Sequence, residues 1–211
     1  IFFRYLVANE KIVDCFHGKR GDYQTIAACR GISIRLRNPV VTNAAKTFAD
    51  LDHLKNHLGI GVWTDEDEWG HWKENGDPIP HIDLMKWADI LLIAPLSANT
   101  LAKIAGGFAD NLVTCILRAW PVANIAAKPV FVAPAMNTHM WDHPLTTKHL
   151  NVLRDELHFH IIPPIPKVLA CGDFGNGAME ELVNIAKIIK QGCARLPQTI
   201  QPPKTRVEIL G

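Results

Sequence analysis

The stretch "DILLIAPLSANTLAKIAGG" (89–107) decides the fold, because it joins two patterns that belong to different secondary structures. Residues 89–95 form a continuous apolar run, which is typical of a strand buried on both faces of a parallel sheet. Residues 97–107 then show helical spacing, with Ser97 or Asn99 available to cap the start of the helix. The sequence therefore predicts a strand that passes directly into a helix.

A second stretch, "KPVFVAPAMNTHM" (128–140), repeats the first half of this pattern. Its apolar run ends in the same Ala-Pro pair. Pro95 and Pro134 each end their strand, because proline lacks the N–H that the ladder of a sheet needs. Small and amide side chains follow both prolines. Since the carboxyl ends of parallel strands share one edge of a sheet, we expect the two following loops to line a crevice there.

The chain from about residue 40 onward alternates short apolar runs with helical patterns. This alternation predicts βαβ units with right-handed crossovers, and hence an α/β fold with a doubly wound, mostly parallel sheet and helices on both faces. The acidic run "DEDE" (65–68) is interpreted as part of a solvated loop (65–78). The predicted strands cover 38–42, 59–64, 89–95, 128–134 and 159–164, and the predicted helices cover 43–54, 81–88, 97–107, 111–120, 145–157 and 179–191.

Composition argues against several classes of protein. The 211 residues are 48% hydrophobic and 20% charged, with a net charge of +1, so we expect a real core and no nucleic-acid surface built on gross charge. No apolar stretch approaches the ~20 residues that span a bilayer. The five cysteines are scattered without a CxxC pair, which favours a reducing, cytoplasmic setting over a zinc or disulfide framework. His53 and His57 stand four apart on a predicted helix without a third ligand, so no metal site is predicted.

Three longer stretches occur together in the order and spacing of a known family. They are "HIDLMKWADILLIAPLSANTLAKIAGGFADNLVTCILRAW" (81–120), "APAMNTHMW" (133–141) and "LACGDFGNGAM" (169–179). They resemble the FMN-dependent cysteine decarboxylases, which include phosphopantothenoylcysteine decarboxylase and the plant halotolerance flavoproteins. The likeness covers roughly residues 40–190.

The resemblance implies a flavodoxin-like fold, a homotrimer, and FMN bound at the contacts between subunits. It makes His81 the active-site histidine, and it makes Cys171 the proton donor on a segment that closes over the substrate. The implied substrate contacts are Asn137, Met140, Leu169 and Ala170, and the implied FMN contacts are Thr42, Asn43, Ser97, Ala98, Asn99, Thr100 and Ala135.

The implied reaction converts phosphopantothenoylcysteine to phosphopantetheine in coenzyme A biosynthesis. Loss of carbon dioxide from a cysteinyl carboxylate leaves a carbanion that nothing adjacent stabilises, so a cofactor must supply the electron sink. The cysteine Cβ gives a hydride to oxidised FMN, decarboxylation then yields a delocalised enethiolate, and the hydride returns from the reduced flavin. His81 offers an imidazole, which exchanges protons near neutral pH. Asn137 can hold a carboxylate without a formal charge and still release it as carbon dioxide.

Residues 1–37 depart from the family pattern. The family opens with a strand and a Gly-Ser-Val-Ala turn whose backbone amides approach the FMN phosphate, whereas "NEKIVD" (9–14) stands where this turn is wanted. "IFFRYLVA" (1–8) can supply the first strand. We predict one flavoprotein domain over 1–192 and a flexible, proline-containing tail over 193–211. Two alternative functions stay open: a non-catalytic trimer subunit that regulates a protein phosphatase, and a decarboxylase of peptides ending in cysteine.

Overall fold

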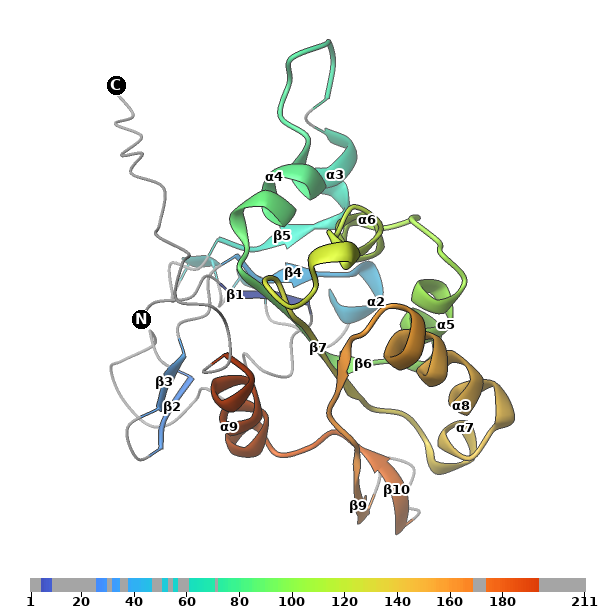
Figure 1. Ribbon diagram of the computed structural model, residues 1–211. Coiled ribbons are helices and arrows are strands. Elements are labelled where there is room, and N and C mark those ends of the chain that lie inside the picture. The colour runs from blue at the N-terminus through green and yellow to red at the C-terminus, as the bar shows by residue number, and fades with distance from the viewer. Residues whose placement is uncertain are drawn as a thin grey trace.

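The fold is built around one parallel sheet (Figure 1). The computed structural model describes residues 5–8, 26–29, 32–34, 38–46, 51–52, 55–56, 61–70, 72–168 and 174–193. In spatial order the strands of this sheet are β5 (Trp63–Thr64), β4 (Val40–Val41), β1 (Tyr5–Ala8), β6 (Ile90–Leu96), β7 (Val130–Pro134) and β8 (His160–Ile161).

Every neighbouring pair in this sheet is parallel. Numbered along the chain, the strands lie in the order 3-2-1-4-5-6, which is one of the two common doubly wound arrangements. The expected parallel α/β sheet is therefore confirmed, but its strand order differs from the 2-1-3-4-5 order of flavodoxin. The chain reverses direction across the sheet between β1 and β6. This pair of strands is the switch point beside which doubly wound folds bind ligands.

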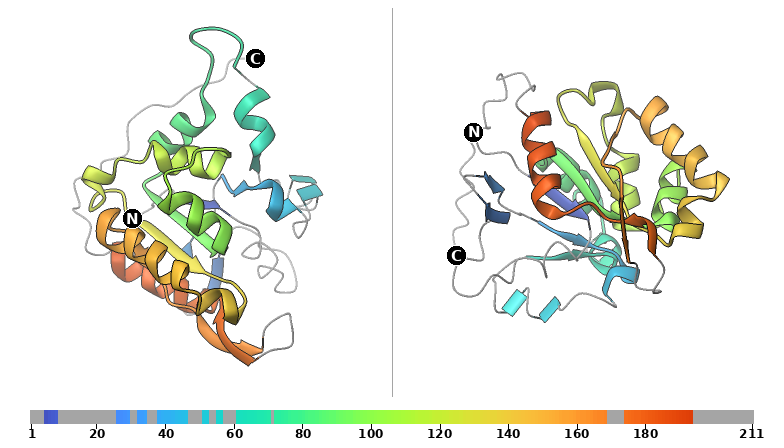
Figure 2. Two further views of the ribbon diagram at one scale, coloured as in Figure 1. Left: turned by 90° about the vertical axis from the view of Figure 1, so that its right-hand side faces the viewer. Right: turned by 90° about the horizontal axis from the view of Figure 1, so that it is seen from below.

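Both faces of the sheet are covered, as the apolar run of β6 predicts. Leu91 and Ile93 face a core that includes Leu101 of α5 and Ile116 of α6. Alternate residues of β6 pack on the other face against α9 (Leu182–Cys193). In Figure 2 the sheet lies between α9, drawn in red, and the green and yellow helices of the opposite layer. The alternation along one strand thus divides the core into two halves.

The helices of the first layer follow the strands closely. They are α4 (Pro80–Trp87), α5 (Ala98–Ala105), α6 (Leu112–Arg118) and α8 (Pro144–Asn151), which continues into the π-helical turn η3 (Val152–Glu156). Shorter helices are α2 (Asn43–Lys46), α3 (Asp65–Gly70), η2 (Val122–Asn124) and α7 (Thr138–Trp141). Two antiparallel hairpins complete the described chain, β2 (Ile26–Cys29) with β3 (Ile32–Ile34) and β9 (Ile165–Val168) with β10 (Phe174–Ala178).

Most of the predicted elements are present, and several regions differ from prediction. Strand β6 continues one residue past Pro95, to Leu96, so this proline lies inside the strand and does not end it. The hairpin β2–β3 was not predicted. Residues 65–70 form helix α3 instead of a solvated loop. The hairpin β9–β10 was not predicted, because its strands contain Pro166 and two glycines, which are poor strand formers. The prediction of a first strand within residues 1–8 is confirmed for residues 5–8, which form β1 in the middle of the sheet.

Several predictions fall outside the described residues. Residues 9–14, where the family has its phosphate-binding turn, lie outside the described residues. The helix predicted over 43–54 is described only in parts, beginning with α2. The predicted tail is described only at Cys193, which closes α9. Across the described parts of the chain, no helix is long and apolar enough to span a bilayer.

Candidate active site

The loops that follow β6 and β7 lie side by side at the carboxyl edge of the sheet. The Ala135 N–H donates to the Leu96 carbonyl at 2.9 Å, so the first residue after β7 continues the ladder beside the end of β6. Ser97 caps helix α5, because its Oγ accepts the Thr100 N–H at 3.2 Å. Of the two caps that the sequence allowed, the structure selects Ser97. The loops therefore meet next to the switch point, as expected.

A third strand end contributes Thr42 and Asn43. Both follow β4, which is separated from β6 by β1. The Thr42 side chain accepts the Ala45 N–H at 3.3 Å and so helps to start helix α2. Because the sheet is parallel, this loop opens at the same edge as the loops after β6 and β7.

Asn137 is the N-cap of the short helix α7. Its Oδ1 accepts the His139 N–H at 2.8 Å, and its side chain is partly buried. Met140 in the same helix is 52% exposed, whereas Met136 packs against the core. The two methionines that flank Asn137 therefore differ in environment, and Met140 is the more exposed of the two.

His81 lies in the first turn of α4 and contacts a buried carboxylate. Helix α4 leads back to the amino end of β6, so its own first turn lies toward the carboxyl edge of the sheet. The His81 Nδ1 atom hydrogen-bonds to Oε1 of Glu68. The Glu68 side chain is 4% exposed and the His81 side chain is 25% exposed. The expected active-site histidine is thus held from its buried side by a residue of α3.

The acidic run 65–68 was interpreted wrongly as solvated. Asp65 is buried, and each of its oxygens accepts one backbone N–H, from Asn43 at 2.9 Å and from Leu112 at 3.1 Å. Those donors belong to the first residues of α2 and α6, where helix N–H groups lack partners within the helix and attract negative charge. Asp65 and Glu68 are three residues apart and so share one helical face, the one signal in the sequence that predicts their common burial.

The hairpin β9–β10 packs against the loop that carries Asn137. The Met136 N–H donates to the Gly177 carbonyl at 2.9 Å. A Cβ added at Gly177, whose φ is +139°, would lie 2.2 Å from the Met136 carbonyl oxygen, and one added at Gly175 would lie 2.5 Å from Thr138 Oγ1. Close backbone contact and a positive φ therefore require glycine at position 177, whereas at position 175 the lack of a side chain leaves room for that of Thr138. The glycine-rich sequence serves to join this hairpin to the loop.

Three expected site residues, Leu169, Ala170 and Cys171, lie outside the described residues. Val168 and Phe174, which flank residues 169–173, are described and exposed. Cys115, in contrast, is a buried cysteine of helix α6. Its burial is the main reason why the pKa of its thiol is raised to about 11, and the nearby charges of Glu68, Asp110 and Asp65 contribute to the increase. A thiol in that setting is unreactive at neutral pH.

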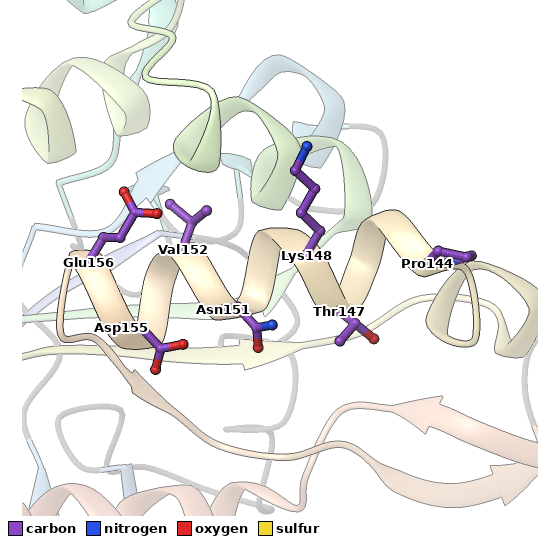
Figure 3. Close-up of a pocket in the computed structure, with 7 residues that line it drawn as sticks. All are labelled: Pro144, Thr147, Lys148, Asn151, Val152, Asp155 and Glu156. Atoms are coloured by element: carbon purple, nitrogen blue, oxygen red, sulfur yellow. The ribbon is translucent and has the colours of Figure 1, made fainter.

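Two surface pockets lined by described residues lie away from the candidate site. One is an open groove on a single helical stretch, α8 with η3, and Figure 3 shows its lining from Pro144 to Glu156. A second lies between α5, α6 and η3 around Phe108 and Trp120. Neither contains a predicted site residue. Among the described residues no cluster of three metal-ligating side chains is found, and His53 and His57 are not among them.

The carboxyl edge has the chemistry that an FMN site needs. Ser97, Ala98 and Ala135 are small, which lets a flat ring approach the backbone, and they lie beside the switch point. The first turn of α5, capped by Ser97, presents backbone N–H groups to an acceptor. Thr42, Asn43, Asn99 and Thr100 add neutral hydrogen-bonding side chains. These residues fit the cofactor that the resemblance implies.

Known proteins match this chain over most of its length. A family described as Flavoprotein matches residues 26–193. The probable phosphopantothenoylcysteine decarboxylase of Arabidopsis thaliana is 57% identical over 142 residues, 67% of each chain. The phosphopantothenoylcysteine decarboxylase of Oryza sativa is 53% identical over 158 residues, 75% of this chain and 69% of that one.

Solved structures agree with the sequence matches. A Cys-to-Ser variant of PPC decarboxylase complexed with pantothenoylaminoethenethiol is 42% identical, with a TM-score of 0.73, over 92% of this chain and 100% of that one. The FMN-binding protein AtHal3 is 46% identical, with a TM-score of 0.68, over 90% and 96%. The resemblance found in the three sequence stretches is confirmed, and the chain belongs to the flavoprotein family, among the phosphopantothenoylcysteine decarboxylases.

Proposed function

We infer that this chain catalyses the FMN-dependent decarboxylation of 4'-phosphopantothenoylcysteine to 4'-phosphopantetheine, a step in coenzyme A biosynthesis. The observation that carries this inference is the meeting of the Ser97 and Asn137 loops beside the switch point of a chain 53–57% identical to plant decarboxylases of this name. FMN, when bound, supplies a reversible acceptor of two electrons, so that carbon dioxide can leave without a localised carbanion.

The roles proposed for the strand-end residues are those that the resemblance implies, and their placement at the carboxyl edge of the sheet supports them. Ser97, Ala98, Asn99 and Thr100 contact FMN from the start of α5, and Thr42, Asn43 and Ala135 contact it from the neighbouring strand ends. Asn137 holds the substrate carboxylate by hydrogen bonds. Because an amide carries no formal charge, it stabilises the ionised ground state less than a lysine would, and carbon dioxide leaves more easily. Met140, exposed in the same helix, contacts the rest of the cysteinyl group.

His81 and Cys171 divide the proton chemistry. His81 exchanges a proton with the substrate thiol and steadies the charge of the enethiolate that decarboxylation leaves. Cys171 then protonates carbon, while Leu169 and Ala170 close with it over the substrate and exclude water. A Cys171→Ser variant is expected to release carbon dioxide and to stop at the enethiol. The Cys-to-Ser relative that was solved with an aminoethenethiol supports this order of steps.

The active unit is proposed to be a homotrimer with FMN between subunits, acting in the cytoplasm. Trp69 and Trp72 are 69% and 55% exposed, and Ile79 near His81 is also exposed. Exposed aromatic residues beside a candidate site are typical of a surface that a second chain covers. Light scattering of the purified protein tests the proposal, which predicts three times the monomer mass.

The sequence leaves two alternative functions open, a phosphatase-regulating subunit and a peptidyl-cysteine decarboxylase, and both differ from the proposed function in testable ways. A phosphatase-regulating subunit would need no turnover. Relatives that act on peptides, such as the peptide-bound variant at 20% identity, share the fold. A comparison of turnover on phosphopantothenoylcysteine and on a peptide ending in cysteine separates the substrates.

The direct test uses the purified chain loaded with FMN. It is expected to be yellow and to release carbon dioxide from phosphopantothenoylcysteine with formation of phosphopantetheine. A folded protein that takes up FMN but leaves this substrate unchanged would contradict the proposed reaction. A folded protein that takes up no FMN would contradict the proposed cofactor site.

A further inference from the structure

Glu68 is a buried carboxylate that the expected machinery does not use. Its Oε1 contacts Nδ1 of His81, and its Oε2 is buried without a hydrogen bond from the described residues. A carboxylate removed from water loses favourable solvation free energy, and a hydrogen-bonding partner must compensate for this loss. The described residues give Glu68 one such partner, the imidazole of His81.

This contact selects one arrangement of the His81 ring. An ionised carboxylate only accepts hydrogen bonds, so the ring nitrogen that faces it must carry the hydrogen. Glu68 is 4% exposed and His81 is 25% exposed, so the exposed part of the ring is the edge away from Nδ1. That edge contains Nε2. The neutral ring therefore presents Nε2 as an acceptor at its exposed edge, and the protonated ring presents it as a donor.

Helix α4 is fixed at its other end as well. The Lys128 ammonium donates to the Met85 carbonyl at 2.5 Å and lies 5.0 Å from the centre of the Trp120 ring. Trp120 in turn donates from its indole N–H to the Lys128 carbonyl at 2.9 Å. Helix α4 is therefore anchored near its carboxyl end by Lys128, independently of the contact between His81 and Glu68.

We propose that Glu68 is a positioning residue for the decarboxylase reaction: it keeps a hydrogen on Nδ1 of His81 and so turns Nε2 toward the substrate. This role rests on the proposed function. Glu68 itself does not touch the reacting atoms. The carboxylate–imidazole contact orients the ring and sets its tautomer, as the partner of the second ring nitrogen does in histidine sites generally.

The Glu68→Gln substitution distinguishes positioning from packing, because the two side chains have nearly the same shape. If the amide oxygen faced His81, the NH₂ would occupy the place of Oε2, where the described residues offer no acceptor. Buried donors without a partner are rarer in proteins than buried oxygens without one. The amide is therefore expected to turn its NH₂ toward Nδ1, which then becomes an acceptor and leaves the hydrogen on Nε2.

The first measurement is the ¹⁵N spectrum of the histidine rings in the FMN-loaded protein at about pH 8.5, well above the ordinary imidazole pKa of ~6.5. The His81 signals are assigned by their loss in His81→Asn. A hydrogen on Nδ1 supports the proposal, whether or not Nε2 is also protonated. A bare Nδ1 with a hydrogen on Nε2 would overturn it. This measurement needs neither substrate nor a Glu68 variant, so it remains readable if the proposed reaction is wrong.

The second measurement compares Glu68→Gln with Glu66→Gln, a control in the same helix whose carboxylate is exposed and pairs with Lys46. Glu68→Gln is expected to invert the His81 tautomer and to lower kcat by about 10- to 100-fold, part of the ~10²–10⁴-fold that a proton-transfer group contributes. KM for phosphopantothenoylcysteine should change little, and the control should match the wild type. A kcat equal to that of the control would overturn the proposal. A lower kcat without a change of tautomer would also overturn it, since the effect would then be one of charge.

Discussion

The strand-end region 89–107 and the acidic helix α3, which contacts the strand-end residue Asn43, differ in how their structure is specified. The structure of residues 89–107 is specified by local features: an apolar run, a proline, and an N-cap in which Ser97 bonds to Thr100, three residues later. The buried face of helix α3, in contrast, is specified by residues distant in the sequence. Asp65 bonds to groups 22 and 47 positions away, and Glu68 bonds to a group 13 positions away. One region is therefore specified locally, and the other by tertiary structure.

The comparison teaches that a charged run is not evidence of solvent exposure. Asp67 acts locally, accepting the Thr64 N–H at 2.7 Å, and Glu66 pairs with Lys46 at the surface. Asp65 and Glu68 lie on the buried face of the same helix. Asp67 and Glu66 thus make the local and surface contacts that the sequence predicts. Asp65 connects the candidate cofactor loop to helix α6, and Glu68 contacts the candidate catalytic histidine.

The largest loss of stability should come from Asp65→Ala. The change leaves the N–H groups of Asn43 and Leu112 without their acceptor, and hydrogen bonds to charged groups contribute about 1.5–3 kcal/mol each. We expect the free energy of unfolding to fall by about 3 kcal/mol, measured by urea denaturation.

Asp65→Asn is the matched variant. Both carboxylate oxygens accept an N–H, so an amide must place its NH₂ against one of the two donors, and a substantial loss should remain. Full stability in Asp65→Asn would show that only one of the two contacts matters.

A comparable effect is expected for Gly177→Ala, which tests how the hairpin joins the Asn137 loop. The added Cβ meets the Met136 carbonyl oxygen, and φ is +139°. The matched control is Gly76→Ala, where φ is +109° but no atom lies within 4 Å of the added Cβ. Backbone strain costs about 1–3 kcal/mol in both, and the steric clash adds to it only at Gly177. Equal losses of unfolding free energy in the two variants would contradict the close packing.

These two predictions show what the sequence can and cannot provide. Apolar periodicity predicted the strands β6 and β7 and the helices beside them, and the prolines located the loops of the candidate site. The partners of Asp65 and Glu68 escaped prediction, because burial of a carboxylate depends on where distant backbone N–H groups and an imidazole come to lie. The hairpin β9–β10 was not predicted, because it contacts the Asn137 loop through the backbone of Gly177, and such contacts leave no apolar pattern in the sequence.

The local region predicts a smaller effect. Ser97→Ala removes the cap of α5 and should lower the free energy of unfolding by about 1 kcal/mol, whereas Ser97→Gly should cost only a few tenths. Urea denaturation of both variants without FMN measures the cap alone. A loss as large as that of Asp65→Ala would remove the distinction between local and long-range specification.

The smallest effect concerns the exposed face of α3. The hydrogen bond from the Lys46 ammonium is the largest of several contacts, with a backbone N–H and the Thr64 side chain, that lower the pKa of Glu66 from 4.5 to about 2. An acid whose pKa is lower in the folded state stabilises the fold above its unfolded pKa, and this contribution disappears as pH falls through the folded value. Lys46→Met should therefore lower the urea midpoint slightly at pH values above 4.5 and have no effect of this kind below about 2. A difference independent of pH would contradict the ion pair as its source.

The central claim is that FMN and substrate meet at the carboxyl edge of the sheet, beside His81. The most direct measurement follows flavin absorbance near ~450 nm and carbon dioxide release in the same sample of His81→Asn. The account predicts a protein that keeps its colour and its substrate binding but releases no carbon dioxide. Undiminished release of carbon dioxide by His81→Asn would contradict it.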